Sequence, residues 1–330
     1  MRRHLSQRLK LHMLRIADAI ESQGSILRAS SLLHLSQPAV TKHLQELEEI
    51  IGTRLFERHS RGVTITKAGS RVVATSRSIL AELMRLEDDL DHLSAPKGGL
   101  VNVGVLPVAA AGMLPGILSR LRGKHPDVGV GLHEARTEEL LPLLAAGEID
   151  FIVGRLYEQV LPDGLHREIL WMEPISLLAR TGHPIFEKTQ PTLQDIQRYE
   201  LVLPTMSQRV GAEIDHILSL LGLEPTPSMR SNSYGFIREM MHATDILSVM
   251  PRLMMVGDLL RGTLRMVPLP VPAPERPAGL ILPRNRQLSA AGVAFVNVIR
   301  TYVEEISTQG LTESRRHLEE GGDSLSYSAA

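Results

Sequence analysis

The sequence predicts an α/β protein in which a mainly helical, winged-helix head precedes one long helix and a two-lobed α/β body. Three observations predict this arrangement. Apolar residues recur at helical spacing over the first part of the chain, up to about residue 52. A repeat of apolar residues at alternating spacings of four and three then runs between residues 72 and 93. From residue 100 onward, short apolar strands alternate with helical patterns, which is typical of α/β lobes.

Length and composition exclude several classes of protein. A chain of 330 residues is long enough for two or three domains with buried cores. The chain has no cysteine, which excludes disulfides and thiolate catalysis and fits a reducing cytoplasm. Charged residues interrupt the basic N-terminus, so it reads as an amphipathic helix instead of a secretory signal. No apolar run approaches about 18 residues, so we expect no membrane span and a cytoplasmic protein.

The charge is divided unevenly along the chain. Residues 1–67 hold 11 Lys and Arg against 6 Asp and Glu, whereas the rest holds 25 against 31. A basic head on an acidic body suggests that only the head meets a polyanion.

The first helices of the head have clear ends. Helical spacing predicts one helix up to about Gly24 and a second over residues 26–33, followed by a short turn. Ser36 is then a good N-cap for a third helix, and Pro38 lies in its first turn, where a missing N–H breaks no helical bond. Gly52 ends this helix.

The third helix has two different faces. Its inward stripe is predicted to be Val40, Leu44, Leu47 and Ile51. Gln37, Thr41 and Gln45 form a polar row at a spacing of four, with Lys42 beside it.

A β-hairpin and a long helix complete the head. Extended segments 55–58 and 63–66 flank a Ser-Arg-Gly turn, which predicts a hairpin wing. Thr66 then caps a helix that runs to about Leu93. Its four-three repeat predicts pairing with the same helix of another subunit, and the alternative is an amphipathic helix packed on its own domain. The proposed dimerisation stripe is Val72, Ile79, Leu83, Leu86, Leu90 and Leu93, with Ser76 in the same register.

The body is predicted to contain two α/β lobes, joined to the head by linker 94–99. In the first lobe, strands at 101–106, 127–134 and 150–155 alternate with helices at 110–126 and 137–149. In the second, the pattern recurs at 173–179, 200–205, 211–223, 235–251 and 279–284. Residues 309–330 are polar, lack a core pattern and are expected to be disordered.

Residues 8–67 resemble the DNA-binding domain of LysR-type bacterial transcriptional regulators. The segments that carry the resemblance are SQPAVTKHLQELEE and GTRLFERHSRGVTITKAG. GMLP, KHPDVGV, LLAAGEIDFIVGRL and GLEP are similar to segments of that family's effector domain. The resemblance implies a DNA-binding domain at 8–66 with its helix-turn-helix at 25–44, a linker helix at 67–95 and a periplasmic-binding-protein-like effector domain at 100–308.

The resemblance also implies a function and partners. Such a regulator is expected to bind double-stranded promoter DNA as a homodimer or homotetramer, to contact RNA polymerase, and to control a catabolic or uptake operon. By analogy its inducer is an aromatic acid or a sugar-derived metabolite. The sign of regulation, the operator and the effector remain open.

The predicted DNA-binding residues follow from groove chemistry. A recognition helix presents its first turns to base edges in the major groove, where amide and hydroxyl side chains can read bases. Arginines of the wing suit phosphate or minor-groove contacts. Ser36 could serve only as a cap, and Arg54 could pair with Glu49 or Glu57. The candidate residues are Ser36, Gln37, Pro38, Thr41, Lys42, Gln45, Arg54, Arg58 and Arg61.

The predicted effector site lies beyond the carboxyl ends of the strands, where helix N-termini offer free N–H groups. The family commonly places a hydroxyl side chain in the first such turn. This chain has Val108 and Ala109 there, which shifts a polar contact to backbone N–H. Arg155 and Arg209 could clamp a carboxylate. Alternatively, each could form a lobe–lobe salt bridge or be a solvated arginine. The candidate residues are Pro107, Val108, Ala109, Thr137, Arg155, Thr205, Ser207, Gln208, Arg209, Ser231, Asn232 and Ser233.

Two other classes of protein were considered. An enzyme is disfavoured because the sequence contains no H-E-x-x-H, G-x-S-x-G, Walker loop or G-x-G-x-x-G, so no catalytic residue, metal ligand or cofactor is predicted. A plain solute-binding protein would explain the lobes but needs an export signal and leaves the basic head unused.

Overall fold

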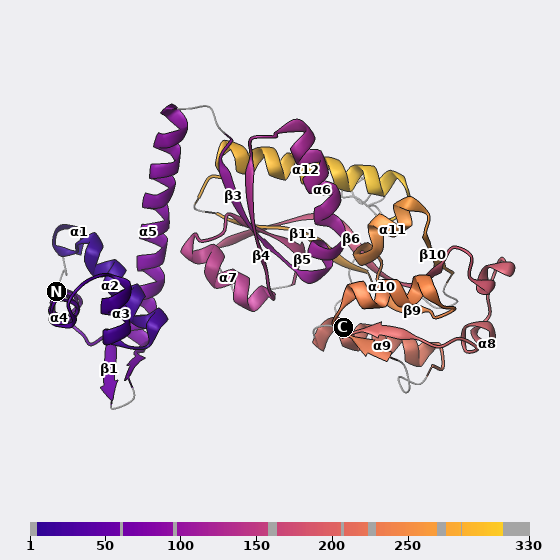
Figure 1. The fold of residues 1–330 in the computed structure, drawn as a ribbon, viewed down its shortest axis with the longest axis horizontal. Coiled ribbons are helices and arrows are strands. Elements are labelled where there is room, and N and C mark those ends of the chain that lie inside the picture. Colours follow the sequence, from indigo (N-terminus) through magenta and orange to yellow (C-terminus); the bar gives the residue numbers. More distant parts are fainter. Residues whose placement is uncertain are drawn as a thin grey trace.

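The computed structural model describes residues 5–59, 62–94, 98–157, 164–205, 208–223, 229–268, 275–284 and 286–312. Its parts follow the chain in the order head, long helix, first lobe, second lobe (Figure 1). The head and long helix contain α1 (Leu5–Arg8), α2 (Leu11–Gln23), α3 (Ile26–Leu32), α4 (Gln37–Ile51), β1 (Phe56–His59), β2 (Gly62–Ile65) and α5 (Lys67–Ser94).

Local signals end the helices of the head where the sequence predicts. Gly24 and Gly52 adopt left-handed backbone conformations, with φ of 58° and 77°, and end α2 and α4. The Ser36 hydroxyl accepts a hydrogen bond from the Ala39 N–H at 3.4 Å, so Ser36 is the N-cap of α4. The caps fix the length of α4 and hence how far its exposed face extends.

The head encloses a core of its own between α2, α3 and α4. The predicted inward stripe of α4 is buried, and it packs against the buried face of α2. The core continues under the hairpin through Leu55 and Phe56. The helices therefore hold α4 with its polar row outward.

The wing is joined tightly to the start of α5. Strands β1 and β2 are antiparallel, as predicted. The Thr66 hydroxyl accepts from the Gly69 N–H at 3.0 Å and donates to the carbonyls of Arg54 and Leu55, so Thr66 both caps α5 and anchors the wing. A Cβ at Gly69 would lie 2.1 Å from the Leu55 carbonyl oxygen, so only glycine fits there.

The stripe of α5 divides into two parts. Val72 is half-buried against the core of the head, and Ser76 is fully buried. The first turns of α5 therefore pack on the head itself, because α2 lies alongside them. Further on, Ile79, Leu86 and Leu90 are exposed, at 38%, 52% and 52%. The side chain of Leu93 lies outside the described residues.

The first lobe holds a mainly parallel sheet with helices on both faces (Figure 1). β3 pairs in parallel with β4 and β5, and β11 pairs antiparallel with β5. The lobe contains β3 (Leu100–Val105), the π-helical turn η1 (Ala109–Met113), α6 (Leu114–Lys124), β4 (Gly129–Glu134), α7 (Thr137–Ala146), β5 (Phe151–Arg155), β11 (Glu275–Pro283) and α12 (Ala290–Thr308).

One long strand connects the two lobes. β6 (Leu165–Arg180) pairs with β11 over its first ten residues and with β9 and β10 over the remainder. The rest of the second lobe consists of η2 (Pro184–Glu187), α8 (Leu193–Ile196), β7 (Val202–Pro204), α9 (Gln208–Leu220), β8 (Met229–Ser231), α10 (Tyr234–Ala243), β9 (Ser248–Pro251), η3 (Arg252–Met255), α11 (Val256–Arg261) and β10 (Leu264–Val267).

The lobes meet closely at η1 and η3. A Cβ at Gly112 would lie 1.6 Å from the Leu253 carbonyl oxygen, so glycine permits this contact. The largest apolar cluster runs through the junction and contains residues of both lobes. The relative position of the lobes therefore depends on packing as well as on the connecting strands.

The beginning of the predicted disordered tail is ordered. Leu311 is buried in the core, and the Arg252 guanidinium donates to the carbonyl oxygens of Gly310 and Leu311. An apolar side chain directly after the glycine is enough to hold this turn. Residues 313–330 lie outside the described residues. Among the described helices, none is long and apolar enough to cross a membrane.

Candidate nucleic-acid interface and effector cleft

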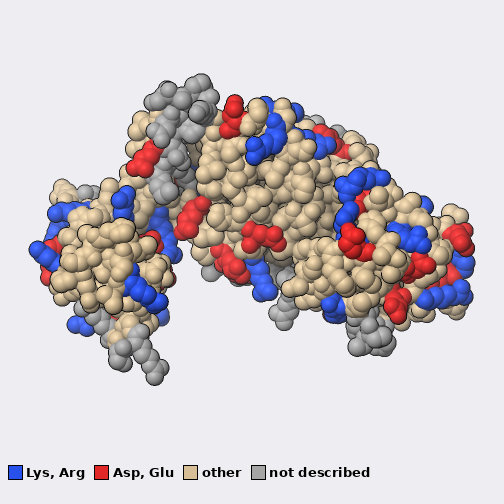
Figure 2. Space-filling model, in the orientation of Figure 1, with Lys and Arg blue, Asp and Glu red and all other residues tan. Residues whose placement is uncertain are grey.

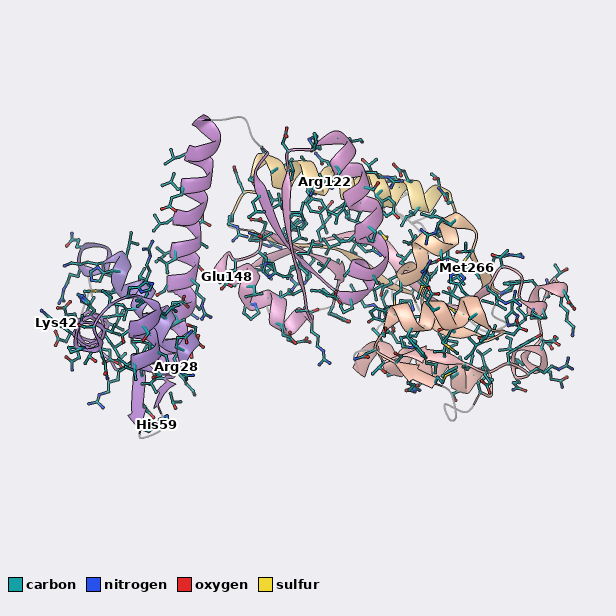
Figure 3. The ribbon with its side chains drawn as sticks, viewed as in Figure 1. Arg28, Lys42, His59, Arg122, Glu148 and Met266 are labelled. Carbon is teal, nitrogen blue, oxygen red and sulfur yellow. The ribbon has the colours of Figure 1, made fainter. Side chains whose placement is uncertain are left out.

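The outer face of α4 carries the predicted polar row. Gln37, Lys42 and Gln45 are exposed, and Thr41 is half-buried between them. Pro38 is exposed in the first turn. Figure 3 shows Lys42 at the outer edge of the head. The row therefore offers amide, hydroxyl and ammonium groups to an external partner.

The wing follows α4 in the chain and carries further basic residues. Arg54 is exposed, and its side chain makes no ion pair among the described residues. The alternative pairings with Glu49 and with Glu57 are therefore both absent there. The backbone of Arg58 belongs to β1, but its side chain and all of Arg61 lie outside the described residues. Figure 3 labels Arg28, Lys42 and His59 on the head. Arg28 is exposed near the start of α3, and the sequence pattern did not single it out.

Glu48 holds the wing against α4. One of its carboxylate oxygens accepts from the backbone N–H of Leu55 at 2.7 Å and of Phe56 at 3.3 Å. Pattern reasoning missed this residue because an acidic residue near a helix end looks like an ordinary solvated side chain. These two hydrogen bonds connect α4 to the beginning of the wing.

On the visible face of the head, Lys and Arg patches outnumber Asp and Glu, whereas the lobes carry mixed charges (Figure 2). This agrees with the excess of Lys and Arg in residues 1–67. A polyanion would be attracted to the head first.

The first-lobe part of the predicted effector site is built from two helix starts. Val108 and Ala109 are buried, at 8% and 1% exposed, so their side chains belong to the core. This turn can therefore contact a ligand only through backbone N–H groups, as the sequence analysis expects. Pro107 has no N–H group to contribute. Thr137 is half-buried at the start of α7.

The second-lobe part is a set of turns that hydrogen-bond to one another. The Thr205 N–H donates to the Ser231 carbonyl at 2.8 Å. The Ser231 hydroxyl accepts from the Ser233 N–H at 3.0 Å, and the Ser233 hydroxyl caps α10 by accepting from the Phe236 N–H at 3.2 Å. Both serines thus shape their loop, and Asn232 is exposed between them. Ser207 lies outside the described residues, as do the side chains of Gln208 and Arg209 at the start of α9.

Arg155 forms ion pairs within the protein. It is 3% exposed, and its guanidinium donates to Glu173 and to Glu213, at 2.8 Å each. The carboxylate in contact with it therefore comes from the protein, which corresponds to the lobe–lobe salt bridge considered from the sequence. Burial raises the pKa of Glu173, and the adjacent guanidinium of Arg155 opposes that rise.

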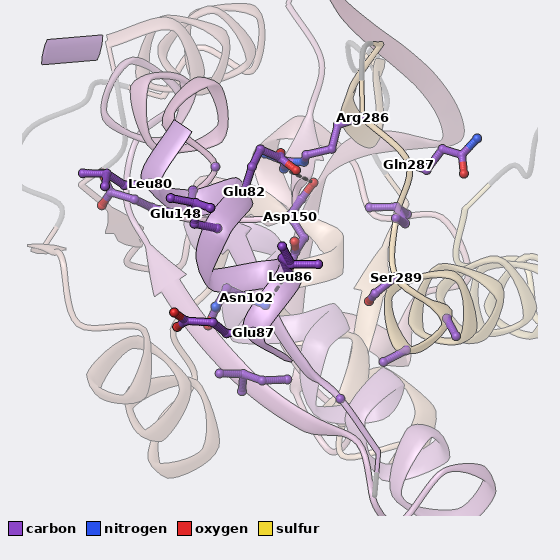
Figure 4. Close-up of a pocket in the computed structure, with 18 of the residues that line it drawn as sticks. Leu80, Glu82, Leu86, Glu87, Asn102, Glu148, Asp150, Arg286, Gln287 and Ser289 are labelled. Atoms are coloured by element: carbon purple, nitrogen blue, oxygen red, sulfur yellow. Dashed lines mark hydrogen bonds between the residues drawn. The ribbon is translucent and has the colours of Figure 1, made fainter. Parts of the chain in front are cut away.

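Two cavities lie away from these residues. One, of about 1350 Å³, lies between α5 and the first lobe. Figure 4 labels residues that line it, among them Leu86 and Glu87 of α5 and Asn102 and Asp150 of the first lobe. The second, of about 570 Å³, lies between α6, α10, α11 and α12. None of the predicted effector residues lines either cavity.

Comparison with known proteins decides the family. The family described as "Bacterial regulatory helix-turn-helix protein, lysR family" matches residues 11–70, and the family described as "LysR substrate binding domain" matches residues 94–304. The chain is a member of the LysR family. It is therefore a DNA-binding transcriptional regulator with an effector-binding domain, and not an enzyme.

Individual LysR-type relatives match along most of the chain. The transcriptional regulator PcaQ of Agrobacterium fabrum is 26% identical over 92% of this chain and 97% of its own. The regulator GalR of Pseudomonas putida is 32% identical over 82% of this chain and 68% of its own.

Solved LysR-type structures share the fold. Full-length CbnR in complex with its target DNA has a TM-score of 0.60 at 20% identity, covering 89% of this chain and all of that one (100%). A full-length variant of OxyR from Pseudomonas aeruginosa also has a TM-score of 0.60 at 20% identity, with coverage of 90% and 95%. These likenesses confirm the winged helix-turn-helix head and the two-lobed body.

Proposed function

We propose that this LysR-type regulator reads promoter DNA with the outer face of α4 and the wing, and controls a catabolic or uptake operon. The observation that carries the proposal is the exposed polar row of α4, held outward by a buried apolar stripe. Base reading falls to Gln37, Thr41, Lys42 and Gln45, with Ser36 and Pro38 forming the helix start. Arg54, Arg58 and Arg61 provide phosphate or minor-groove contacts.

The response of the regulator is assigned to the two lobes. A small molecule, an aromatic acid or a sugar-derived metabolite, binds between them and favours one arrangement of the lobes. Thr137 on the first lobe and Thr205 on the second are the polar groups proposed to contact it. The protein works in the cytoplasm as a homodimer or homotetramer paired through α5, and it contacts RNA polymerase at the promoter.

Binding of the whole chain to DNA tests the proposal. The probe is the intergenic DNA next to the protein's own gene, and the control is a shuffled sequence of equal composition. Fluorescence anisotropy at several salt concentrations should show tighter binding to the intergenic DNA and a linear loss of log affinity with log salt. Equal affinity for both DNAs at every salt concentration would contradict sequence-specific reading.

A further inference from the structure

An ionic cluster joins the two lobes at the carboxyl end of β5. Arg155 ends β5 in the first lobe, and Arg276 lies in β11, in register with Glu173 of β6. Glu213 belongs to α9, whose apolar face packs in the core of the second lobe. The cluster therefore contains one group that belongs to the second lobe alone.

Glu213 bridges the two arginines with its two oxygens. One oxygen accepts from Arg155 Nη1 at 2.8 Å, and the other accepts from Arg276 Nε at 2.8 Å. The Glu213 side chain is 15% exposed, whereas that of Arg276 is 50% exposed. A carboxylate held between two guanidinium groups is how proteins commonly bind a small carboxylate ligand.

Arg155 retains binding capacity in this cluster. Its Nη2 atom is buried and has no hydrogen-bond partner among the described residues. A buried donor without a partner costs free energy, so the guanidinium would gain from a further acceptor.

The charges restrict which group can replace Glu213. Two arginines face two carboxylates, so the cluster is neutral as it stands. Moving Glu213 away without replacement would leave Arg155 paired with Glu173 alone, with its Nη1 donor unpaired, and would leave Arg276 without its carboxylate partner. A carboxylate ligand would accept from both guanidinium groups and restore the charge balance, which a neutral ligand would not.

We infer that Arg155 and Arg276 form a carboxylate-binding seat, which Glu213 occupies in this arrangement and a small carboxylate ligand occupies in its place. Glu213 then ties the second lobe to the first, and the ligand releases that tie while keeping the charges balanced. The inference rests on the proposed response to a small molecule. It narrows the ligand to a carboxylate and names the contact that the ligand replaces.

The seat can be tested without knowing the natural ligand, with acetate as the probe. Glu213→Ala removes the internal carboxylate, so sodium acetate should raise the melting temperature of this variant by several degrees over sodium chloride of equal ionic strength. Wild-type protein should respond much less. The matched control is Asp215→Ala, on the same helix, where the carboxylate pairs with Arg230 at 2.9 Å on the surface. Equal effects of acetate and chloride on Glu213→Ala, or the same response from Asp215→Ala, would overturn the seat.

A separate experiment tests whether the contact of Glu213 with the two arginines holds the lobes together, by measuring a distance between the lobes. Because the chain has no cysteine, Arg122→Cys on the first lobe and Gln194→Cys on the second can carry spin labels selectively. Glu213→Ala should broaden the label–label distance distribution, with or without acetate, since acetate balances charge but is not attached to the second lobe. An unchanged distribution would overturn the tie.

A second variant covers the case in which Glu213→Ala does not fold. Glu213→Ser also removes the carboxylate and leaves the seat open, so it should show the same acetate response and the same broadening. Binding to the intergenic DNA is recorded for every variant. Failure of the acetate test with intact DNA binding removes the seat alone, whereas absence of specific DNA binding by the wild-type protein contradicts the proposed function.

Discussion

At the scale of single residues, the recognition helix separates base reading from structure. Gln37 is exposed in the first turn of α4 and takes no part in the buried stripe. Gln37→Ala should therefore leave the fold intact and cost about 1–3 kcal/mol on the specific site, with little loss on random DNA. Anisotropy titrations on both DNAs measure this. Gln194→Ala, an exposed glutamine on α8 of the second lobe, is the control and should change neither affinity.

A second prediction at the residue scale concerns the hydrogen bonds of Glu48. Glu48→Ala would leave the N–H groups of Leu55 and Phe56 without their acceptor, at a cost of about 1–3 kcal/mol in local stability. Amide hydrogen exchange at these two residues should speed up accordingly. The neighbouring exposed Glu49→Ala should leave both exchange rates as in the wild type, and equal acceleration in the two variants would contradict the role given to Glu48.

At the scale of elements, α5 combines a packed beginning with an exposed apolar continuation. Leu86 is 52% exposed, so Leu86→Asp should cost the isolated chain little, yet place an unpaired charge in any seam with a second α5. Analytical ultracentrifugation should show smaller species with weakened operator binding. Glu87→Ala, at the next position, is the control. An unchanged assembly would favour the alternative in which α5 only packs within its own chain.

Asp258 joins α10 to α11 and gives a pH-dependent prediction. It is buried, which by itself raises its pKa, but hydrogen bonds from Arg238, Thr263 and Arg261 outweigh burial and lower the pKa from 3.8 to about 2. Since the lowered pKa belongs to the folded state, the stabilisation is present above about pH 4 and is lost as pH falls through about 2. The shift corresponds to about 2 kcal/mol.

Asp258→Asn tests this assignment. The variant should destabilise the second lobe at pH 6, and its difference from the wild type should fall to about half by pH 3. Thermal unfolding at both pH values measures the difference. Asp215→Asn, which removes an exposed ion pair with Arg230, should change stability by less than about 1 kcal/mol at either pH. A pH-independent loss in Asp258→Asn would show that its carboxylate charge is not responsible.

At the scale of the whole molecule, α7 connects the proposed effector cleft to the long helix. Thr137 starts α7, and the carbonyl of Ala145 near its end accepts from the Ser78 hydroxyl of α5 at 2.8 Å. A ligand that moves α7 can therefore change the position of α5 and, through it, the head. Coupling of this kind requires that the ligand favour one of two arrangements.

Thr137→Val tests that route. It keeps the shape of the side chain but removes a hydroxyl, which should cost a bound ligand about 1–3 kcal/mol. In a reporter strain grown on a series of carboxylate carbon sources, the variant should need more of the inducing compound for the same expression. Operator binding should stay normal. Thr75→Val, exposed on α5 away from the lobes' strand ends, is the control, and identical induction curves for wild type and Thr137→Val would exclude Thr137 from the effector site.

The sequence alone determined the head almost completely, because its signals are local. Ser36, Gly24, Gly52 and the four-three stripe of α4 act within one or two helical turns, so caps, helix ends and the buried face could be predicted. The same local logic located most strands of the two lobes and supported the LysR resemblance. It missed α12, although the buried residues of that helix recur at helical spacing, and the polar first half of β6, which is held by pairing with β11.

Only the tertiary structure decided the partners of groups far apart in the chain. The sequence left open whether Arg155 clamps a ligand or forms a salt bridge, and the fold brings Glu213, 58 positions away, to its guanidinium. Val72 fitted the heptad repeat, yet its half-buried side chain packs against the core of the head. Glu48 gave no signal, because its role exists only once the wing folds back onto α4. The spacing of apolar residues predicts which face of a helix or strand is buried. Which other element packs on that face depends on contacts between residues far apart in the chain.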